Sequence, residues 1–296
     1  MIAENPYLDP KRIKAALNGL GIRPNRDMGQ NFLADADALA AIVEAGQLSA
    51  DDTVIEIGPG LGVLTYELVR RAGRVIAIEL DRRLGARLGD ELGSANLTVI
   101  QNDVLRVKPR DVLGDATSYK VVANLPYQIT SAILRHFLEA VPPPELMVVM
   151  VQWEVAQRIV AAPPEMSVLA HSIQLYAEPE IVVHVPAAAF LPEPRVDSAV
   201  LRLTRRPSPA VAVDDVDAFF RVIKAGFLHA RKKLLNGLEG GLAAMGIRID
   251  RATLLTVLEA AGVDPARRAE TLTLREWATI YRRVSALAPV TDHGTR

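Results

Sequence analysis

The sequence predicts a doubly wound α/β protein with a mostly parallel sheet of seven strands, followed by a small helical domain. Three observations predict this fold. Short β-branched runs alternate with segments of helical spacing up to residue 152, a glycine-rich turn joins the first of these runs to the next helix, and helical spacing alone returns after residue 213. Alternation of unbroken apolar strands with helices is typical of a parallel sheet covered on both faces.

The predicted elements follow one another in a regular order. Asp9 suits the cap of a helix over residues 9–20, and a second helix is predicted over 35–45. The strands of the alternating part are predicted at 53–57, 74–80, 97–101, 119–124 and 146–152. The helices between them are predicted after Leu61 and at 82–92 and 131–138. Two further strands, 180–185 and 198–203, close the sheet as a hairpin-like pair and complete a Rossmann-like architecture.

A change of pattern marks the second domain. Residues 206–213 read RPSPAVAV, and their prolines and serine interrupt both periodicities, which predicts a linker. Beyond the linker, helical spacing returns in DAFFRVIKAGF, ARKKLLNGL, ATLLTVLEAAG and REWATIYRRV. We therefore divide the chain into residues 1–206 and 207–296.

Composition limits the class of protein. Half of the 296 residues are hydrophobic, and none is cysteine, which excludes disulfides and thiolate metal sites. No apolar run approaches the roughly 18 residues of a membrane span, so we expect a cytoplasmic protein without a membrane or a metal. Residues 205–296 contain 15 Lys and Arg against 10 Asp and Glu, although the whole chain carries a net charge of -1. The basic charge that suits nucleic acid therefore lies in the C-terminal part.

A glycine-rich turn predicts a cofactor site. The segment VIEIGPGLG (54–62) runs from a strand into a helix, and Gly58 and Gly60 let a ligand approach the backbone. Glu79 lies at the end of the next strand, where a carboxylate can accept hydrogen bonds from ribose hydroxyls, and Asp103 follows the third strand. An ordinary turn and solvated loop carboxylates are the alternatives. The loop lacks the G-x-G-x-x-G of nicotinamide cofactors and resembles the first motif of S-adenosylmethionine methyltransferases.

The segment NLPY (124–127) after the fourth strand indicates the substrate. The amide oxygen of Asn124 and the carbonyl of Leu125 could each accept one hydrogen of an adenine amine, which would localise its lone pair for attack on a methyl group. Tyr127 offers an aromatic face to an extruded base, and Phe190 is a candidate for the opposite face. A turn residue at 124 and core packing at 190 are the alternatives.

Together these residues resemble the small-subunit ribosomal RNA adenine N6-dimethyltransferases. The matching segments are GQNFL (29–33), EIGPGLGVLT (56–65), IELD (78–81), QNDVL (101–105), NLPYQI (124–129), VQWEVAQRI (151–159), FLPEPRVDSAVLRL (190–203) and RAETLTLREWATIYR (268–282). The resemblance implies that the residues bordering S-adenosylmethionine are Gln30, Asn31, Leu33, Gly58, Gly60, Glu79, Asp103 and Asn124. It also implies that Tyr127 and Phe190 enclose the target base.

The resemblance implies an activity and partners. We expect an enzyme that methylates two adjacent adenosines in a hairpin loop of small-subunit rRNA during ribosome biogenesis, acting as a monomer on immature small subunits. One alternative is a resistance-type methyltransferase for large-subunit rRNA. Another is a nucleic-acid-binding relative without turnover.

The chain departs from the family at two places near the RNA. The family commonly has lysine where Trp153 stands, and a longer basic loop where this chain has AAPPEM (161–166). Trp153 could stack on a nucleotide or pack against a neighbouring helix. The basic residues of the second domain that we expect to face phosphates are Arg231, Lys232, Lys233, Arg267 and Arg268, with a solvated helix face as the alternative.

Overall fold

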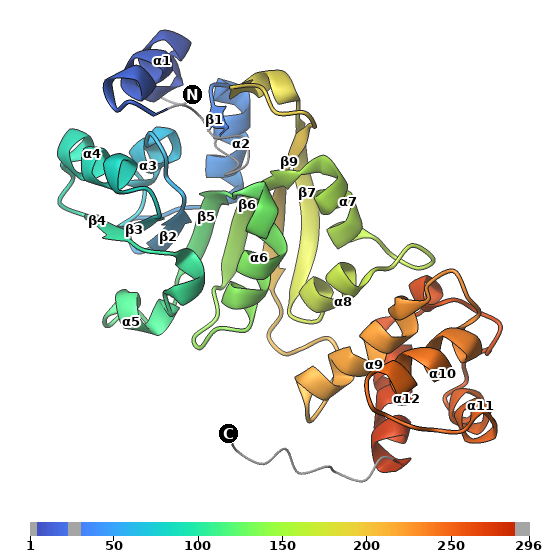
Figure 1. Ribbon diagram of the computed structural model, residues 1–296. Coiled ribbons are helices and arrows are strands. Elements are labelled where there is room, and N and C mark those ends of the chain that lie inside the picture. Colours follow the sequence, from blue (N-terminus) through green and yellow to red (C-terminus); the bar gives the residue numbers. More distant parts are fainter. Residues whose placement is uncertain (1–4, 23–30, 288–296) are drawn as a thin grey trace. The chain divides into compact units, whose positions relative to one another are not determined.

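The computed structural model describes residues 5–22 and 31–287, which fall into two compact units (Figure 1). The first unit comprises the chain up to Gln157 together with Ala177–Arg205, and the second comprises Arg158–Tyr176 and the chain from Arg206. These units differ from the predicted segments 1–206 and 207–296 because residues 158–176 group with the C-terminal helices. The reason is packing: Leu175 lies in the core of those helices, and the buried His171 places its Nε2 3.2 Å from the carbonyl oxygen of Leu272.

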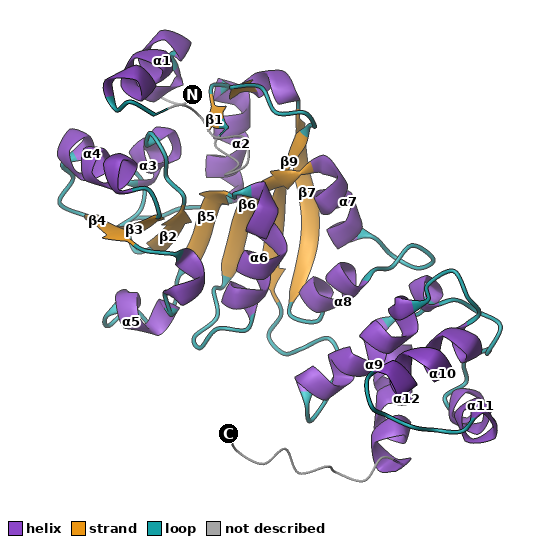
Figure 2. Cartoon of the chain, viewed as in Figure 1, coloured by secondary structure: helices purple, strands orange, loops and turns teal. Residues whose placement is uncertain are grey.

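A seven-stranded sheet forms the centre of the first unit, in the order β4-β3-β2-β5-β6-β9-β7 (Figure 2). The strands are β2 (Thr53–Ile57), β3 (Arg74–Glu79), β4 (Leu97–Gln101), β5 (Lys120–Asn124), β6 (Leu146–Gln152), β7 (Ala177–Val185) and β9 (Ser198–Arg205). Strands β2 to β6 pair in parallel, whereas β9 runs antiparallel to both β6 and β7. The predicted mostly parallel sheet and its hairpin-like closing pair are confirmed.

Buried strands and capped helices explain why this part of the chain folds as it does. Strand β6 is buried from Leu146 to Val151, as expected for a strand covered on both faces. The helices around the sheet are α1 (Pro10–Gly19), α2 (Ala36–Ala45), α3 (Val63–Leu68), α4 (Arg82–Leu92), α5 (Pro109–Leu113), α6 (Thr130–Leu138) and α7 (Trp153–Val160). Asp9 and Asp35 cap α1 and α2 by accepting backbone N–H bonds from Lys11 and Ala38.

A second, small sheet escaped the sequence analysis. Strands β1 (Phe32–Leu33) and β8 (Phe190–Leu191) pair antiparallel, with Leu33 opposite Phe190. Short 3-10 turns stand at Pro6–Leu8 (η1), Val104–Arg106 (η3), Tyr127–Ile129 (η4) and Ala187–Ala189 (η5). The pairing joins the segment before α2 to the connection between β7 and β9.

The second unit is a set of helices around Trp277, whose side chain is fully buried. Its elements are α8 (Val168–Gln174), α9 (Val216–Leu228), α10 (Leu234–Ala244), α11 (Arg251–Ala260), η6 (Ala269–Thr271) and α12 (Leu274–Leu287). The segment ARKKLLNGL, for which helical spacing was predicted, is helical only from Leu234. Residues 231–233 form a turn, because α10 begins only at Leu234, whose N–H donates to the Arg267 carbonyl.

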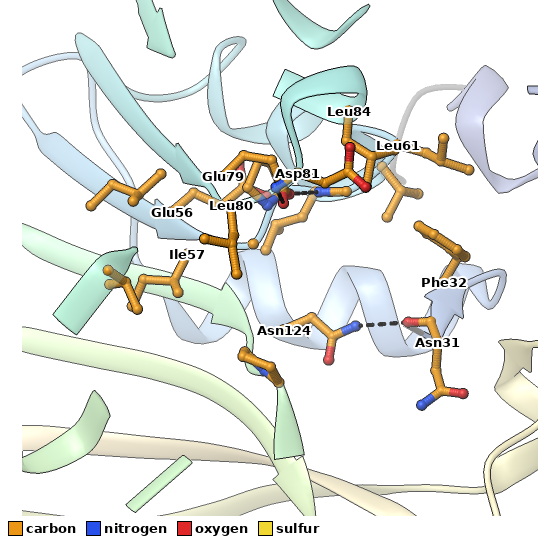
Figure 3. Close-up of a pocket in the computed structure, with 18 of the residues that line it drawn as sticks. Asn31, Phe32, Glu56, Ile57, Leu61, Glu79, Leu80, Asp81, Leu84 and Asn124 are labelled. Carbon is orange, nitrogen blue, oxygen red and sulfur yellow. Dashed lines mark hydrogen bonds between the residues drawn. The ribbon is translucent and has the colours of Figure 1, made fainter. Parts of the chain in front are cut away.

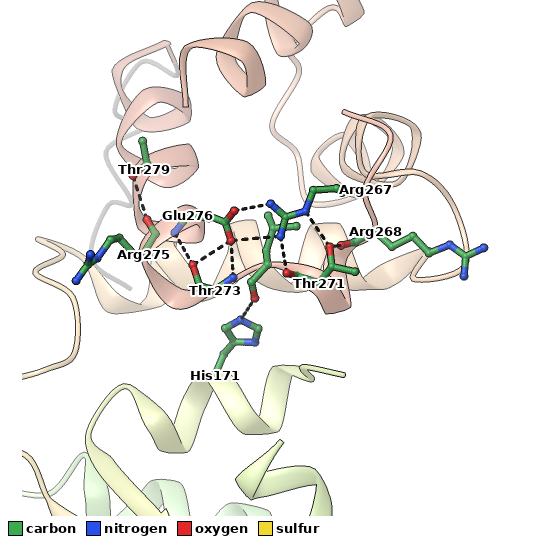
Figure 4. Close-up of polar contacts among 9 residues, drawn as sticks. His171, Arg267, Arg268, Thr271, Thr273, Arg275, Glu276 and Thr279 are labelled. Atoms are coloured by element: carbon green, nitrogen blue, oxygen red, sulfur yellow. Dashed lines mark hydrogen bonds and ion pairs between the residues drawn. The ribbon is translucent and has the colours of Figure 1, made fainter. Parts of the chain in front are cut away.

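A polar network fixes the segment before α12. The Arg267 guanidinium pairs with Glu276 and donates from Nε to the Thr271 hydroxyl at 3.1 Å (Figure 4). Glu276 also accepts the Thr273 N–H at 2.8 Å. Arg267 is therefore committed to internal contacts, whereas the exposed Arg268 makes only a long ion pair, 3.9 Å, with Glu270.

Among the helices in the described ranges, none combines the length and apolar character that crossing a membrane requires.

Candidate active site

One cavity of about 310 Å³ opens at the carboxyl ends of β2, β3, β4 and β5 (Figure 3). Ligands of open α/β sheets bind outside these strand ends. The predicted cofactor residues that line the cavity are Asn31, Leu33, Gly58, Gly60, Glu79, Asp103 and Asn124. The predicted Gln30 lies outside the described residues. The geometry thus gathers residues that are up to 93 positions apart, as the contact between Asn31 and Asn124 shows.

The glycine-rich turn after β2 follows a path that favours glycine. Gly58, Gly60 and Gly62 have φ of +63°, +58° and +90°, in the left-handed region. A Cβ on Gly60 would lie 3.2 Å from the Phe32 ring, and a Cβ on Gly62 would lie 2.6 Å from Leu88. The turn therefore combines positive φ with close approach, which leaves backbone rather than side chain at the cavity wall.

Glu79 joins two of the strand-end loops. Its side chain is 7% exposed and accepts hydrogen bonds from the backbone N–H groups of Gly60 at 3.1 Å and Asp81 at 2.9 Å. Burial raises the pKa of Glu79, although these hydrogen bonds act in the opposite direction. Each carboxylate oxygen retains a second lone pair, so Glu79 can still accept a pair of hydroxyl hydrogens.

Glu56 is a site residue that the sequence analysis missed. It lines the cavity, is 1% exposed, and its Oε2 has no hydrogen-bond partner in the described structure. Burial, reinforced by the nearby Glu79 carboxylate, raises the pKa of Glu56 to about 8. The sequence could have revealed Glu56, because it is the one charged residue in the mainly apolar strand TVIEI. A buried acid of this kind favours a cationic ligand group.

Asp103 and Asn124 stand at the ends of the next two strands. Asp103 caps η3 by accepting the Leu105 N–H at 3.0 Å, and it lines the cavity. Asn124 ends β5 and donates from Nδ2 to the Asn31 carbonyl at 3.4 Å. This contact leaves the Asn124 carboxamide oxygen available as an acceptor at the cavity (Figure 3).

The other predicted catalytic residues do not line the cavity. Leu125 is buried, and its N–H donates to the Met150 carbonyl at 3.1 Å. The Tyr127 hydroxyl lies 2.6 Å from Ser198 Oγ, and burial raises its pKa. Phe190 is 3% exposed and packs in a core shared with α2 and the central strands. The catalytic roles of these residues stay predictions.

The N-terminal segment contributes a wall of the cavity that the sequence did not reveal. Tyr7 and Ile13 line the cavity. Asn5 anchors this segment to α3 by donating from Nδ2 to the Val63 carbonyl at 2.9 Å and to Glu67 at 3.0 Å. Glu67 is fully buried and also pairs with Arg71. The contact spans 62 residues of sequence, and no local pattern announces it.

The raised pKa of Glu56 predicts a pH-dependent stability for the ligand-free protein. The folded chain holds a proton that the unfolded chain, with its ordinary pKa, has already released, so stability falls as pH rises through about 8. Relative to Glu56→Gln, the parent should lose roughly 2 kcal/mol between pH 6 and 8. Urea unfolding at several pH values measures this difference. The exposed Glu44→Gln is the control, and parallel pH profiles for parent and Glu56→Gln would contradict the assignment.

Comparisons with known proteins agree with this architecture. The family described as "Ribosomal RNA adenine dimethylase" matches residues 21–281. "Ribosomal RNA small subunit methyltransferase A" of Dehalococcoides mccartyi strain BAV1 is 46% identical over 279 residues, 94% of each chain, and that of Moorella thermoacetica is 44% identical over 284 residues, 92% of this chain and 96% of the other.

Solved structures are similar over most of the chain. The 23S rRNA methyltransferase ErmE has a TM-score of 0.67 and 30% identity and covers 86% of this chain and 100% of its own. A dimethyladenosine transferase from Plasmodium falciparum has a TM-score of 0.70 and 24% identity, with coverages of 84% and 95%, and supports the fold. On the strength of the family match and the full-length relatives, this chain belongs to the ribosomal RNA adenine dimethylase family.

Proposed function

We propose that this chain transfers methyl groups from S-adenosylmethionine to the exocyclic amine of two adjacent adenosines in a small-subunit rRNA hairpin loop. The observation that carries the proposal is the Asn124 carboxamide, held at the end of β5 beside a cavity that a glycine turn and two buried acids border. Membership of the rRNA adenine dimethylase family and the names of relatives that match over nearly the whole chain support it.

The cavity fits S-adenosylmethionine in the chemistry of its residues. When bound, this cofactor supplies an electrophilic methyl group on a positively charged sulfur. The Oε2 atom of the buried Glu56 has no hydrogen-bond partner in the described structure and can accept a cationic group, and the backbone at Gly58 and Gly60 leaves room for the amino-acid portion. Glu79 offers two oxygens to the ribose hydroxyls, and Asp103 offers an acceptor to the adenine amine. Gln30, Asn31 and Leu33 complete the proposed set.

The proposed catalysis rests on positioning. The Asn31 carbonyl holds Asn124 Nδ2, so the carboxamide oxygen is oriented before the substrate arrives. That oxygen and the Leu125 carbonyl each accept one hydrogen of the adenine amine, which localises the nitrogen lone pair without adding a buried charge. Pre-oriented acceptors of this kind lower the barrier because they need no rearrangement during the reaction.

The target base is proposed to stack on Tyr127. The hydrogen bond between the Tyr127 hydroxyl and Ser198 fixes the ring, so stacking costs little side-chain entropy. We retain Phe190 as the opposite face, because β8 holds it directly across from Leu33, which lines the cavity.

The RNA-facing surface of the second unit is proposed to be the turn of Arg231, Lys232 and Lys233 together with Arg268. All four are exposed, whereas Arg267 is occupied by Glu276 (Figure 4). Arg267 is therefore not among the proposed phosphate contacts. We further propose that the chain acts as a cytoplasmic monomer on immature small subunits.

Methyl incorporation tests the proposed function against its alternatives. Purified protein and labelled cofactor are incubated with small subunits from cells that lack this enzyme, and the RNA is digested for mass spectrometry. Dimethyladenosine in small-subunit rRNA is expected. Transfer to naked large-subunit RNA instead would support the resistance-type alternative, and binding without transfer would support the non-catalytic one.

Replacing Asn124 should stop the chemistry and spare cofactor binding. Asn124→Ala should lower kcat by at least about 100-fold, because an oriented acceptor at the reacting amine is lost. Cofactor affinity, measured by calorimetry, should change by only a few fold. Asn102→Ala is the matched control, since Asn102 lines the same cavity at the end of β4. A loss confined to cofactor binding would show that the role of Asn124 is misassigned.

Replacing Tyr127 should weaken capture of the base. In single-turnover kinetics, Tyr127→Ala should raise the half-saturating RNA concentration by roughly 5-fold or more, because one stacking face is lost. Tyr127→Phe keeps the ring and removes only the hydroxyl bonded to Ser198, so it should stay close to the parent. Equal damage to cofactor and RNA binding in Tyr127→Ala would count against stacking.

Replacing the basic turn should reduce the salt dependence of RNA binding. Each of Arg231→Ala, Lys232→Ala and Lys233→Ala should reduce the slope of log K against log salt by about 1, because one phosphate contact is lost. Filter binding over a range of salt concentrations measures the slopes. Arg248 is an exposed basic residue of the same unit outside the turn, so Arg248→Ala should leave the slope unchanged.

A further inference from the structure

We propose that Trp153 is a second nucleobase platform, which stacks on the nucleotide next to the target adenosine. This inference rests on the proposed function, because it assumes an RNA substrate. It assigns a role to a residue that the transfer chemistry does not use.

The sheet places Trp153 at the same edge as the proposed reacting amine. Asn124 pairs with Met150 across β5 and β6, and Trp153 follows directly after β6. The Trp153 N–H donates to the Asp197 carbonyl at 2.9 Å, while the Tyr127 hydroxyl bonds to the next residue, Ser198. Tyr127 and Trp153 are thus attached to adjacent residues at the start of β9.

A polar cluster braces the Trp153 ring. The indole meets the His184 imidazole at right angles, with ring centroids 4.8 Å apart and an interplanar angle of 88°. His184 Nε2 lies 2.9 Å from Asp197 Oδ2, and the other oxygen of Asp197 accepts the Ala187 N–H at 2.9 Å. A ring held in this way loses little further freedom when a base stacks on it.

The indole keeps surface for a ligand. A perpendicular neighbour such as His184 covers at most one face of the indole, and Trp153 is only partly buried. Two exposed apolar side chains, Val182 and Val196, stand within two residues of His184 and Asp197 in the sequence. A partly exposed aromatic ring braced by a polar pair suits a nucleobase.

The chemistry of base extrusion supplies the occupant. When an adenine leaves its stack for the cavity, the neighbouring base loses a stacking partner, and an aromatic ring can replace that partner without reading sequence. The proposed substrate contains adjacent adenosines, so a neighbour is always present beside the target. Trp153 would hold that neighbour while Tyr127 holds the target.

Intrinsic fluorescence tests the placement. The chain contains two tryptophans, and Trp277 is fully buried in the second unit. A hairpin RNA with the two adenosines, shown by anisotropy to be saturated with protein, should quench the tryptophan fluorescence of the parent protein. It should not quench the fluorescence of Trp153→Phe, which retains only Trp277. An abasic residue in place of the neighbouring base should remove the quenching from the parent. Quenching that persists in Trp153→Phe would overturn the proposal. So would quenching of the parent protein that is the same with the abasic RNA as with the intact RNA.

Kinetics on unmethylated small subunits separate this inference from the proposed function. Trp153→Ala should lower kcat/KM about tenfold, mainly by raising KM, and Trp153→Phe should restore most of the loss; thermal unfolding verifies that both variants are folded. If the parent transfers methyl groups and Trp153→Ala matches it, the platform is disproved and the function stands. If the parent transfers none, the proposed function itself fails.

Discussion

The Glu79 carboxylate is the contact on which the cavity depends. By accepting N–H bonds from Gly60 and Asp81, it ties the glycine turn after β2 to the loop after β3. A second acid, Glu56 of β2, lies in the same low-dielectric pocket, where burial and the nearby Glu79 carboxylate both disfavour its ionisation. A positively charged ligand group would relieve that repulsion. The arrangement therefore makes the pocket selective for charge before any contact with a substrate is formed.

Much of the fold was predictable, because its signals are local. Strands β2 to β6 are mainly apolar runs of five to seven residues. Asp9, Asp35 and Asp81 are the N-caps of α1, α2 and α4, and each directly precedes its helix in the sequence. The paired strands β1 and β8 have two residues each, too few to show a period. The grouping of α8 with the C-terminal helices depends on contacts such as His171 with Leu272, which are 101 residues apart. The basic turn was mistaken for helix because its lysines fit a helical pattern equally well.

The residues of the candidate site also divide into those that the sequence could predict and those that it could not. Glu79, Asp103 and Asn124 could be predicted because each ends a strand, and parallel strands bring their carboxyl ends to one edge. Glu56 carried a signal that was overlooked, an acid within an apolar run. Tyr7 and Ile13 carried none, since apolar and aromatic residues of an N-terminal helix announce nothing about the wall they form. For Phe190, the motif indicates stacking on a base, whereas the structure shows it packed in a hydrophobic core. The sequence could not separate the two roles, because an aromatic side chain suits both.

The anchoring of the N-terminal segment links two walls of the cavity. The wall formed by Tyr7 and Ile13 belongs to a segment that Asn5 fastens to α3 through the Val63 carbonyl and the buried Glu67. Helix α3 begins at Val63, directly after the glycine turn, so the turn and the N-terminal wall share one support. A substitution that shifts α3 would therefore displace both walls together.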